Sequence, residues 1–383
     1  MQFVMNKTIY IVLEQDLIFY PPVISIMNIC LDLGCQVVYI GTFGDQEGQK
    51  RLENKGARFK QVVPRDMNES SIAKYLNRIK FRNKIYRYLA ESNISDKDYV
   101  WIFHSYTFYL LYELVDKYNV IYHPLEFSAF KMTWKQRLLS PGLNMVEAVK
   151  KAKKVVCCEY NRAQITKGIF SLDRLPFILP NKMYLPNETL PSTAQIDEYL
   201  SLMQGKKVIL YQGVFHDKER RLEEFCEAVQ SLPEEYMLIA MGKGSAYYEN
   251  LKKKYTSEKI LFIPFIKPPY HLLITKMASI GILSYFPVST TIYEVLNPIY
   301  CAPNKIFEYA RYGVPMISND IPGLSYIFNQ YHCGRVVKDP MTPSAIKQVI
   351  EDIYADYDVY SQGALDYYNS VDVKQIVNDI LTD

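Results

Sequence analysis

The sequence contains no long apolar run and no pair of cysteines spaced as metal ligands. No stretch approaches the roughly 18 consecutive apolar residues of a transmembrane helix, so none is expected. The seven cysteines include no C-x-x-C pair and their number is odd, which argues against a disulfide framework or a zinc site. We interpret them as reduced, buried thiols in a reducing compartment. They are Cys30, Cys35, Cys157, Cys158, Cys226, Cys301 and Cys333.

Several catalytic and binding signatures are also absent. The sequence has no P-loop, no H-E-x-x-H pair and no nucleophile elbow. Its 33 tyrosines are scattered without the stacking pattern of single-strand binding proteins, so we expect no nucleic-acid partner. The N-terminal run reaches Glu14 and Asp16 too soon for a signal peptide, so we expect a cytoplasmic protein.

The chain is long enough for two domains, and its charge is divided unevenly between its halves. With 383 residues and 49% hydrophobic content, it can bury two cores without disulfide support. Lys and Arg outnumber Asp and Glu by 26 to 17 in residues 1–185, whereas acidic residues lead by 24 to 18 in residues 186–383. This asymmetry predicts an anionic partner for the first half.

Short apolar runs alternate with helical stretches along the chain. The runs are continuous, as in strands that are buried on both faces of a parallel sheet with crossover helices. We therefore predict an α/β protein made of two successive doubly wound halves. The predicted strands are 8–14, 35–41, 58–63, 99–103, 119–123, 154–159, 207–213, 236–242, 259–265, 280–285, 314–318 and 334–338.

A segment rich in Pro, Asn, Ser and Thr at 180–205 predicts the join between the halves. We expect an N-terminal domain over 1–183, a C-terminal domain over 184–365 and a final helix over 366–383, for which packing back on the first domain is one option. Ligands of open α/β sheets bind beyond the carboxyl ends of the strands. The cleft between two facing domains is therefore the expected active site.

The segment 297–320 combines helix signals with residues suited to a diphosphate. Pro303 and the N-cap candidate Asn304 precede a helical run that a glycine can end. A helix N-terminus that faces the cleft offers free N–H groups to an anion, and Lys305 adds a cation. Glu308 could accept hydrogen bonds from ribose hydroxyls. A capped helix in an ordinary βαβ unit explains the same pattern.

A second signal follows the strand predicted at 207–213. Gly213 closes this strand, and a loop leads to a helix that we expect to begin near Arg220. A loop at the carboxyl end of a strand is where a phosphate-binding cation should stand, although a solvated helix start is equally basic. The loop carries His216, Lys218, Arg220 and Arg221.

In the first half, His104 and Glu126 each follow a predicted strand. Both would stand at the sheet edge that faces the cleft, His104 as a polar contact and Glu126 as a carboxylate that orients a hydroxyl. A capping histidine and a surface glutamate are the alternatives.

Two basic stretches, 74–89 and 130–154, contain almost no acidic residue. The first predicts an amphipathic helix whose cations, among them Lys80, Arg82 and Lys84, suit an anionic membrane surface. A solvated helix face is the alternative. The apolar face of this helix is expected to hold Ile72, Tyr75, Leu76 and Ile79.

The segment 297–320 resembles the signature of glycosyltransferase family 4, a family of retaining enzymes with the GT-B fold of two facing Rossmann-like domains. One branch of the family carries a pattern close to P-N-K-x-F-E-Y-x-x-x-G-x-P. Glu308 matches a family glutamate that binds the ribose, and Tyr300 replaces a second glutamate common in the wider family. The matching residues are Pro303, Asn304, Lys305, Phe307, Glu308, Tyr309, Gly313 and Pro315.

The resemblance also implies a basic residue that binds the donor diphosphate after the strand at 207–213. Alignment from the following helix gives Arg220, and alignment from the strand gives Lys218. We favour Arg220 because the apolar stripe within Leu222–Val229 fixes the register. On the acceptor side, a family His-Glu pair often falls at positions 125 and 126, of which only Glu126 is kept.

The resemblance implies a retaining transfer of a sugar from a nucleoside diphosphate sugar to a hydroxyl of a glycan. The acceptor is expected to be lipid-linked, at the inner face of the cell membrane, in the synthesis of a capsule or another surface polysaccharide. Arg220, Lys305 and the helix N-terminus at Asn304 would stabilise the leaving group without a metal or another cofactor. The alternatives are a sugar-nucleotide epimerase or hydrolase of the same fold, and a non-catalytic member that binds glycan or nucleotide sugar.

Overall fold

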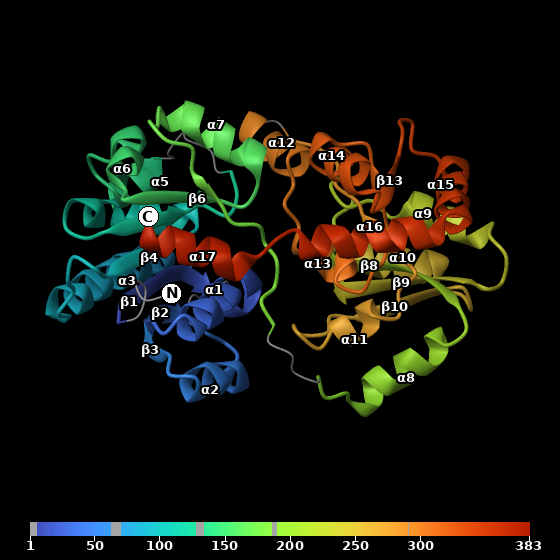
Figure 1. Ribbon diagram of the computed structural model, residues 1–383, viewed down its shortest axis with the longest axis horizontal. Coiled ribbons are helices and arrows are strands. Elements are labelled where there is room, and N and C mark those ends of the chain that lie inside the picture. Colours follow the sequence, from blue (N-terminus) through green and yellow to red (C-terminus); the bar gives the residue numbers. More distant parts are fainter. Residues whose placement is uncertain (1–5, 63–69, 128–133, 186–189, 290) are drawn as a thin grey trace. The chain divides into compact units, whose positions relative to one another are not determined.

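The computed structural model describes residues 6–62, 70–127, 134–185, 190–289 and 291–383. The chain forms two compact units. Unit 1 holds Met1–Tyr184 together with Asp372–Asp383, and unit 2 holds Leu185–Val371. Each unit has its own parallel sheet flanked by helices (Figure 1). The active-site cleft expected between the two domains stays a prediction.

The sheet of unit 1 has seven strands in the order β3-β2-β1-β4-β5-β6-β7, and every neighbouring pair is parallel. The order reverses beside β1, as in a doubly wound fold. The strands are β1 (Thr8–Asp16), β2 (Gln36–Thr42), β3 (Arg58–Gln61), β4 (Tyr99–Phe103), β5 (Val120–His123), β6 (Lys154–Cys157) and β7 (Phe177–Ile178).

Helices cover both faces of this sheet because successive strand residues point to opposite faces and both sets are apolar. Helices α3, α4 and α6 bury one face, and α1 and α17 lie side by side at the other (Figure 1). The helices of unit 1 are α1 (Pro21–Asp32), α2 (Gln46–Asn54), α3 (Ser71–Glu91), α4 (Ser105–Leu111), α5 (Trp134–Leu139), α6 (Met145–Lys151), α7 (Tyr160–Phe170) and α17 (Val373–Thr382), with short 3-10 turns η1 (Leu17–Phe19) and η2 (Tyr112–Asp116).

The sheet of unit 2 has six parallel strands in the order β10-β9-β8-β11-β12-β13. They are β8 (Lys207–Val214), β9 (Tyr236–Lys243), β10 (Ile260–Pro264), β11 (Ile280–Leu283), β12 (Met316–Asn319) and β13 (Gly334–Val337). The helices are α8 (Ala194–Met203), α9 (Glu223–Gln230), α10 (Ala246–Tyr255), α11 (Leu272–Thr275), α12 (Ile292–Ile299), α13 (Asn304–Ala310), α14 (Pro322–Tyr331), α15 (Pro343–Ala355) and α16 (Tyr357–Asn369).

Strand β8 shows how the unit 2 sheet divides two apolar cores. Val208 and Leu210 pack with α8, α13, α14 and α16 on one face, whereas Ile209 and Tyr211 pack with α9, α10 and α15 on the other. The carboxyl end of β8 therefore stands at the centre of the unit, beside the point where the strand order reverses. This is the edge at which open α/β sheets bind ligands.

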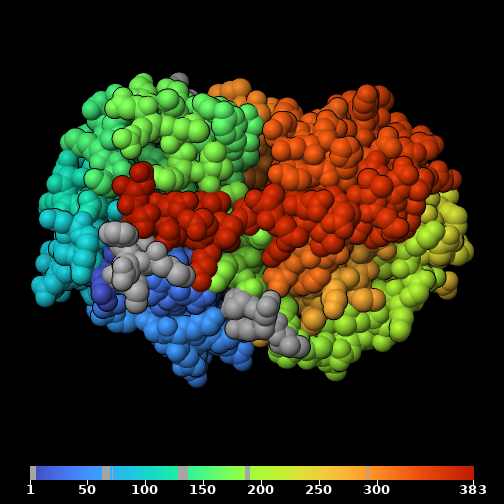
Figure 2. Space-filling model, in the orientation of Figure 1, coloured from blue at the N-terminus to red at the C-terminus, as the bar shows by residue number. Residues whose placement is uncertain are grey.

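The last helix, α17, belongs to the first unit although the preceding helix belongs to the second. Its inner face buries Val373, Val377, Ile380 and Leu381, and its outer side is exposed on the face shown in Figure 2. Lys7 and Lys154 donate hydrogen bonds to the carbonyl oxygens of the last helical turn. These cations satisfy carbonyl groups that have no partner within the helix.

The twelve predicted strands are all present, with boundaries within a few residues, and β7 is an additional strand of two residues. Residue 63 of one predicted strand, 130–133 of the second basic stretch and 186–189 of the predicted join lie outside the described residues. The helix expected over 366–383 is interrupted. Asp372 accepts a hydrogen bond from the Gln375 N–H, which starts a new helix after α16 has ended. All seven cysteines are free and buried, as predicted.

Candidate functional site

The carboxyl end of β8 brings a glycine against a lysine from a distant segment. Gly213 has φ of 138°, in the region that favours glycine. A Cβ atom on Gly213 would lie 3.2 Å from Lys305 Nζ, so the missing side chain leaves room for the lysine. The structure thus brings together two residues that the sequence analysis assigned to separate motifs.

Lys305 stands in the first turn of α13. The structure places Pro303, not Asn304, at the N-cap, and it shows no side-chain capping bond there. Proline suits this position because its fixed φ and missing N–H cost nothing before the first turn. The helix is anchored by buried Ile306 and Phe307, and the chain leaves it through Gly313, whose φ is 64°.

The Lys305 ammonium lies over two tyrosine rings, 4.6 Å from the Tyr211 centroid and 5.2 Å from the Tyr285 centroid. Among the described residues, no carboxylate or other hydrogen-bond acceptor pairs with it. Burial lowers the pKa of Lys305 to about 7, with the Arg220 charge acting in the same direction and the Glu308 charge opposing it.

Arg220 lies in the turn between β8 and α9 rather than at the start of the helix, because α9 begins only at Glu223. Its guanidinium is 4.1 Å from the centroid of the Tyr285 ring and donates a hydrogen bond to the Glu219 carbonyl oxygen at 2.8 Å. Lys218 is exposed. Of the two candidate cations, Arg220 is therefore the one that shares an aromatic side chain with Lys305.

Glu308 lies one turn further along α13 and is buried, with 7% of its surface exposed. Gln212 Nε2 donates to Glu308 Oε2 at 2.6 Å, and His271 Nε2 lies 3.3 Å from Glu308 Oε1. The Thr275 hydroxyl donates to Gln212 Oε1 at 2.8 Å, which fixes the orientation of the amide. Both carboxylate oxygens of Glu308 thus have protein partners.

These contacts decide the ionisation of Glu308. Burial acts to raise its pKa, but His271, Gln212 and Lys305 outweigh burial, so the pKa lies below the ordinary value. Gln212, His271 and Thr275 were not predicted from the sequence as partners of Glu308. Gln212 alone carried a signal, since it is a polar residue near the end of an otherwise apolar strand.

Tyr300 lies in the connection between α12 and α13. It follows α12, where its N–H donates to the carbonyl oxygen of Leu296, and its side chain is half-buried. Arg220, Lys305 and Glu308 gather around the end of β8. Position 300, where the wider family has a glutamate, therefore holds a residue at the end of a helix.

In unit 1, His104 caps α4. It has a positive φ of 68°, and its Nδ1 accepts a hydrogen bond from the Tyr106 N–H at 3.3 Å. Its ring meets that of Tyr20 edge-on at a centroid distance of 6.2 Å. Glu126 is exposed in the turn after β5. Each residue follows its strand as predicted, and His104 has the capping role weighed as its alternative.

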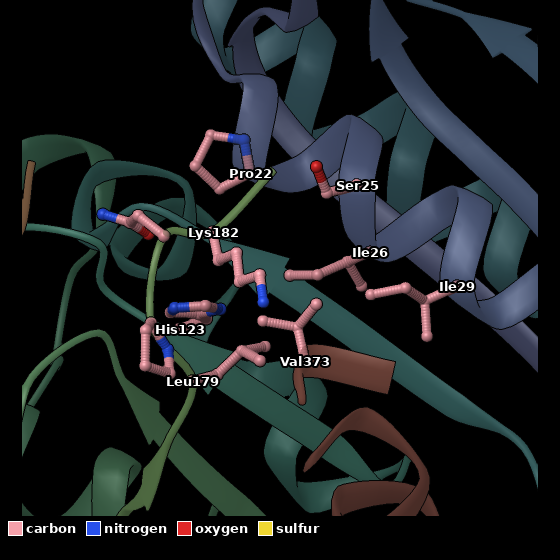
Figure 3. Close-up of a pocket in the computed structure, with 10 residues that line it drawn as sticks. Pro22, Ser25, Ile26, Ile29, His123, Leu179, Lys182 and Val373 are labelled. Carbon is pink, nitrogen blue, oxygen red and sulfur yellow. The ribbon is translucent and has the colours of Figure 1, made fainter. Parts of the chain in front are cut away.

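A histidine that the sequence analysis passed over lies beside these two. His123 ends β5 and is buried next to the Trp101 and Phe103 rings. Neither ring nitrogen has a hydrogen-bond partner among the described residues, and burial lowers the pKa of His123 to about 3. Figure 3 shows it at a small cavity with Ser25, Lys182 and Val373, a space for about one water molecule.

The basic helix predicted at 74–89 lies within α3. Lys80 and Lys84 are exposed, but Arg82 Nη1 donates to the Leu139 carbonyl oxygen at 2.7 Å. The apolar side chains on this helix divide into two sets. Ile72 and Leu76 are 75% and 49% exposed, whereas Phe81, Ile85 and Leu89 are buried in the core and Tyr75 and Ile79 pack partly against it.

Two parallel-sheet Rossmann-like domains are the elements of the GT-B fold, and solved structures with this fold resemble the chain. Residues 206–356 match the family model for glycosyl transferases group 1. The matched region contains Arg220, Lys305 and Glu308. No curated protein sequence matches the chain.

Solved structures share the fold at low sequence identity. Alr3699/HepE of Anabaena in complex with UDP has a TM-score of 0.66 and 12% identity, with 98% of each chain covered. WaaG, a glycosyltransferase involved in lipopolysaccharide biosynthesis, has a TM-score of 0.62 and 13% identity, with 97% of this chain and 98% of the other covered. A putative UDP-N-acetylglucosamine 2-epimerase from Listeria monocytogenes has a TM-score of 0.62 and 12% identity, covering 98% and 95%.

Two further observations concern the described residues only. No helix among them combines the length and hydrophobicity needed to cross a membrane. No group of three or more His, Cys, Asp and Glu side chains among them is arranged to hold a metal ion.

Proposed function

We propose that the protein is a glycosyltransferase that moves a sugar from a nucleoside diphosphate sugar to a hydroxyl of a glycan acceptor. The observation that carries this proposal is the meeting of Arg220 and Lys305 at the end of β8. Neither cation forms an ion pair with a carboxylate in the described part of the chain, and two such cations suit a ligand that brings two or more negative charges. The match of residues 206–356 to a glycosyltransferase family supports it.

In this mechanism, the diphosphate lies against Arg220 and Lys305. Negative charge grows on the diphosphate as its bond to the sugar breaks, and fixed cations stabilise that charge more than they stabilise the bound donor. We propose that these residues make a divalent metal unnecessary. Retention of the anomeric configuration is part of the proposal, with the departing phosphate assisting the acceptor hydroxyl.

Glu308 is proposed to bind the ribose hydroxyls. An ionised carboxylate has about four lone-pair sites, of which Gln212 and His271 occupy two. The remaining sites can accept hydrogen bonds from the two hydroxyls of a ribose. The low pKa keeps the group an acceptor, and its fixed orientation reduces the entropy that the ligand must lose.

The donor nucleotide to test first is UDP, which HepE and one other protein of this fold bind in their solved structures. We propose Gly213, Lys218, Tyr300, Pro303 and Asn304 as further residues that bind the donor. On the acceptor side we propose His104 and Glu126 as polar contacts. We further propose a lipid-linked acceptor, in surface polysaccharide synthesis at the inner face of the cell membrane.

The test compares single variants for UDP affinity and transfer rate. Arg220→Ala should lower turnover more than it lowers UDP affinity, because the charge on the diphosphate grows in the transition state. Arg221→Ala is the matched control, since Arg221 pairs with Glu224 and lies over Phe286 instead of Tyr285. A folded Arg220→Ala protein with unchanged affinity and turnover would refute the diphosphate assignment.

Glu308→Gln tests the ribose contact. The amide keeps the shape but loses a charge-assisted hydrogen bond worth roughly 1.5–3 kcal/mol, so affinity for UDP should fall by about one to two powers of ten. Binding of inorganic pyrophosphate, which has no ribose, should change far less. An equal loss for both ligands would mean that Glu308 acts through Lys305.

An epimerase or hydrolase is the rival function, because the Listeria neighbour that shares the fold is described as a putative epimerase. Such an enzyme would consume the nucleotide sugar without an acceptor. Incubation of UDP-sugars with and without glycan acceptors, in EDTA, separates the possibilities. Turnover only with an acceptor and in the presence of EDTA supports the proposed transferase, whereas turnover without acceptor favours the rival.

A further inference from the structure

A buried tyrosine lies at the meeting point of the two cations. Tyr285 follows β11 and is only 7% exposed. Its ring centroid is 4.1 Å from the Arg220 guanidinium carbon and 5.2 Å from Lys305 Nζ. These two residues come from segments more than 80 positions apart in the sequence, and both contact the Tyr285 ring.

The backbone of Tyr285 is held by hydrogen bonds to a residue of the neighbouring strand, β12. Asn319, at the end of β12 and itself 4% exposed, accepts a hydrogen bond from the Tyr285 N–H at 2.9 Å. The same side chain donates to the Tyr285 carbonyl oxygen at 2.6 Å. Both backbone polar groups of Tyr285 are therefore held by one buried amide, which leaves the ring little freedom to move away.

A second ring completes the surroundings of the lysine. Tyr211, in β8, is fully buried, and its hydroxyl donates to the Val214 carbonyl oxygen. Lys305 Nζ lies 4.6 Å from its centroid. The lysine therefore contacts two aromatic rings. The Tyr211 ring is held through its hydroxyl, and Tyr285 is held through its backbone groups.

The like charges of Arg220 and Lys305 repel each other, and the Glu308 carboxylate opposes this effect on Lys305 without forming an ion pair with it among the described residues. The negative face of an aromatic ring attracts a cation, and the attraction strengthens when water is excluded. A ring offers this attraction without neutralising the cation as a carboxylate would. It can therefore hold the cations in place while leaving their charge available to a ligand.

We propose that Tyr285 is a positioning residue, whose buried ring holds Arg220 and Lys305 in one site that is preorganised for a diphosphate. The identity of the ligand rests on the proposed function, whereas the positioning of the two cations by Tyr285 does not depend on it. The neighbouring pair of Arg221 and Phe286, with 4.9 Å between guanidinium carbon and ring centroid, provides a comparison within the same loop.

The test uses Tyr285→Phe, which keeps the ring, with Tyr285→Leu and Tyr285→Met, which remove it. Phe286→Leu is the matched control, because it removes the adjacent cation–ring pair without touching Lys305. Inorganic pyrophosphate and UDP are titrated calorimetrically, and thermal melts check folding. We expect pyrophosphate affinity within about twofold of the parent for Tyr285→Phe and Phe286→Leu, and about tenfold weaker for Tyr285→Leu and Tyr285→Met.

A second readout does not depend on the nucleotide. The rate at which an amine-specific acylating reagent modifies Lys305 is followed against pH by peptide mass spectrometry. Loss of the ring should change the pH dependence of the Lys305 acylation rate in Tyr285→Leu and Tyr285→Met. Tyr285→Phe, which keeps the ring, should leave it unchanged. Identical profiles and identical pyrophosphate affinities in all variants would overturn the proposal. If the parent binds neither ligand, the proposed function fails, and the labelling profile still decides whether Tyr285 positions Lys305.

Discussion

Lys305 carries a charge in a place where the fold disfavours it. With a pKa of about 7 in the folded protein, it differs by more than three units from the ordinary lysine value of about 10.4. Between these two pH values the unfolded chain keeps a proton that the folded chain has released. The contribution of this lysine to the free energy of unfolding therefore rises with pH from about 7 to 10.

Replacing Lys305 by Met should remove this pH dependence. Each unit of pKa shift corresponds to about 1.4 kcal/mol, and because the side chain keeps some contact with solvent we expect Lys305→Met to be about 2–3 kcal/mol more stable at pH 6. The difference should shrink towards pH 9.5. Urea unfolding at both pH values measures it, and parallel curves for parent and variant would contradict the prediction.

Nucleotide binding should be linked to the uptake of a proton by the same lysine. At pH 8 most of the Lys305 population is neutral in the free protein, whereas a bound diphosphate favours the ammonium form. UDP binding at pH 8 should thus take up close to one proton, and affinity should fall as the pH rises above 7. Calorimetry in buffers of different ionisation enthalpy counts the protons, and Lys305→Met should show none.

The residues of the site fall into two groups: those that a local sequence motif identifies, and those whose partners are distant in the sequence. Lys305 and Glu308 lie in one short motif, and Arg220 lies in a basic loop, so local pattern was enough to select them. Thr275 and Tyr285 contact Gln212 and Arg220, more than 60 positions away in the sequence, and His271 contacts Glu308, 37 positions away. No local pattern encodes such pairings, and the ionisation of Glu308 could not be predicted without them.

At the scale of elements, continuous apolar runs located the strands because a doubly wound sheet buries both faces of each strand. The start of α9 was harder to place. The sequence 218–221 is basic and compatible with a first helical turn, but the chain forms a turn until Leu222 reaches the core. The final helix was placed only as an option on the first domain, since an apolar stripe alone does not identify the core that it contacts.

The docking of α17 gives a prediction for this element. Ile380 is fully buried, and truncating it should lower the stability of unit 1 by about 2–5 kcal/mol. Gln375→Ala, an exposed change on the same helix, should stay within about 0.5 kcal/mol of the parent. Denaturant unfolding followed by hydrogen exchange assigns the loss to a unit. A loss confined to unit 2 would contradict the placement of this helix.

For the whole molecule, the basic first half leads to a prediction about membranes. Exposed Lys80 and Lys84 share α3 with exposed Ile72 and Leu76, which is the combination that binds anionic bilayers. Each lysine near such a surface contributes about 1 kcal/mol, so Lys80→Glu with Lys84→Glu should reduce binding to anionic vesicles more than tenfold. Added salt should weaken the binding of the parent.

The control for this experiment lies in the other unit. Lys252→Glu with Lys253→Glu reverses two exposed lysines of α10 and changes net charge by the same amount. Arg82 is left intact because its hydrogen bond to Leu139 would confuse a loss of binding with a loss of structure. Equal effects of the two double variants in vesicle sedimentation would show that net charge, rather than α3, governs binding.

The division of the chain has a consequence for its synthesis. All of unit 2 lies between Tyr184 and Asp372, so it emerges from the ribosome as one uninterrupted segment and can fold as soon as it is complete. Unit 1 begins first but finishes last. Its surface beside α1 stays uncovered until α17 has been synthesised. At about 5–20 residues per second, the 187 residues of unit 2 take roughly 10–40 seconds to translate. During that interval the apolar face that α17 later covers is exposed on the nascent protein. We therefore expect chaperones to bind mainly to the incomplete first unit.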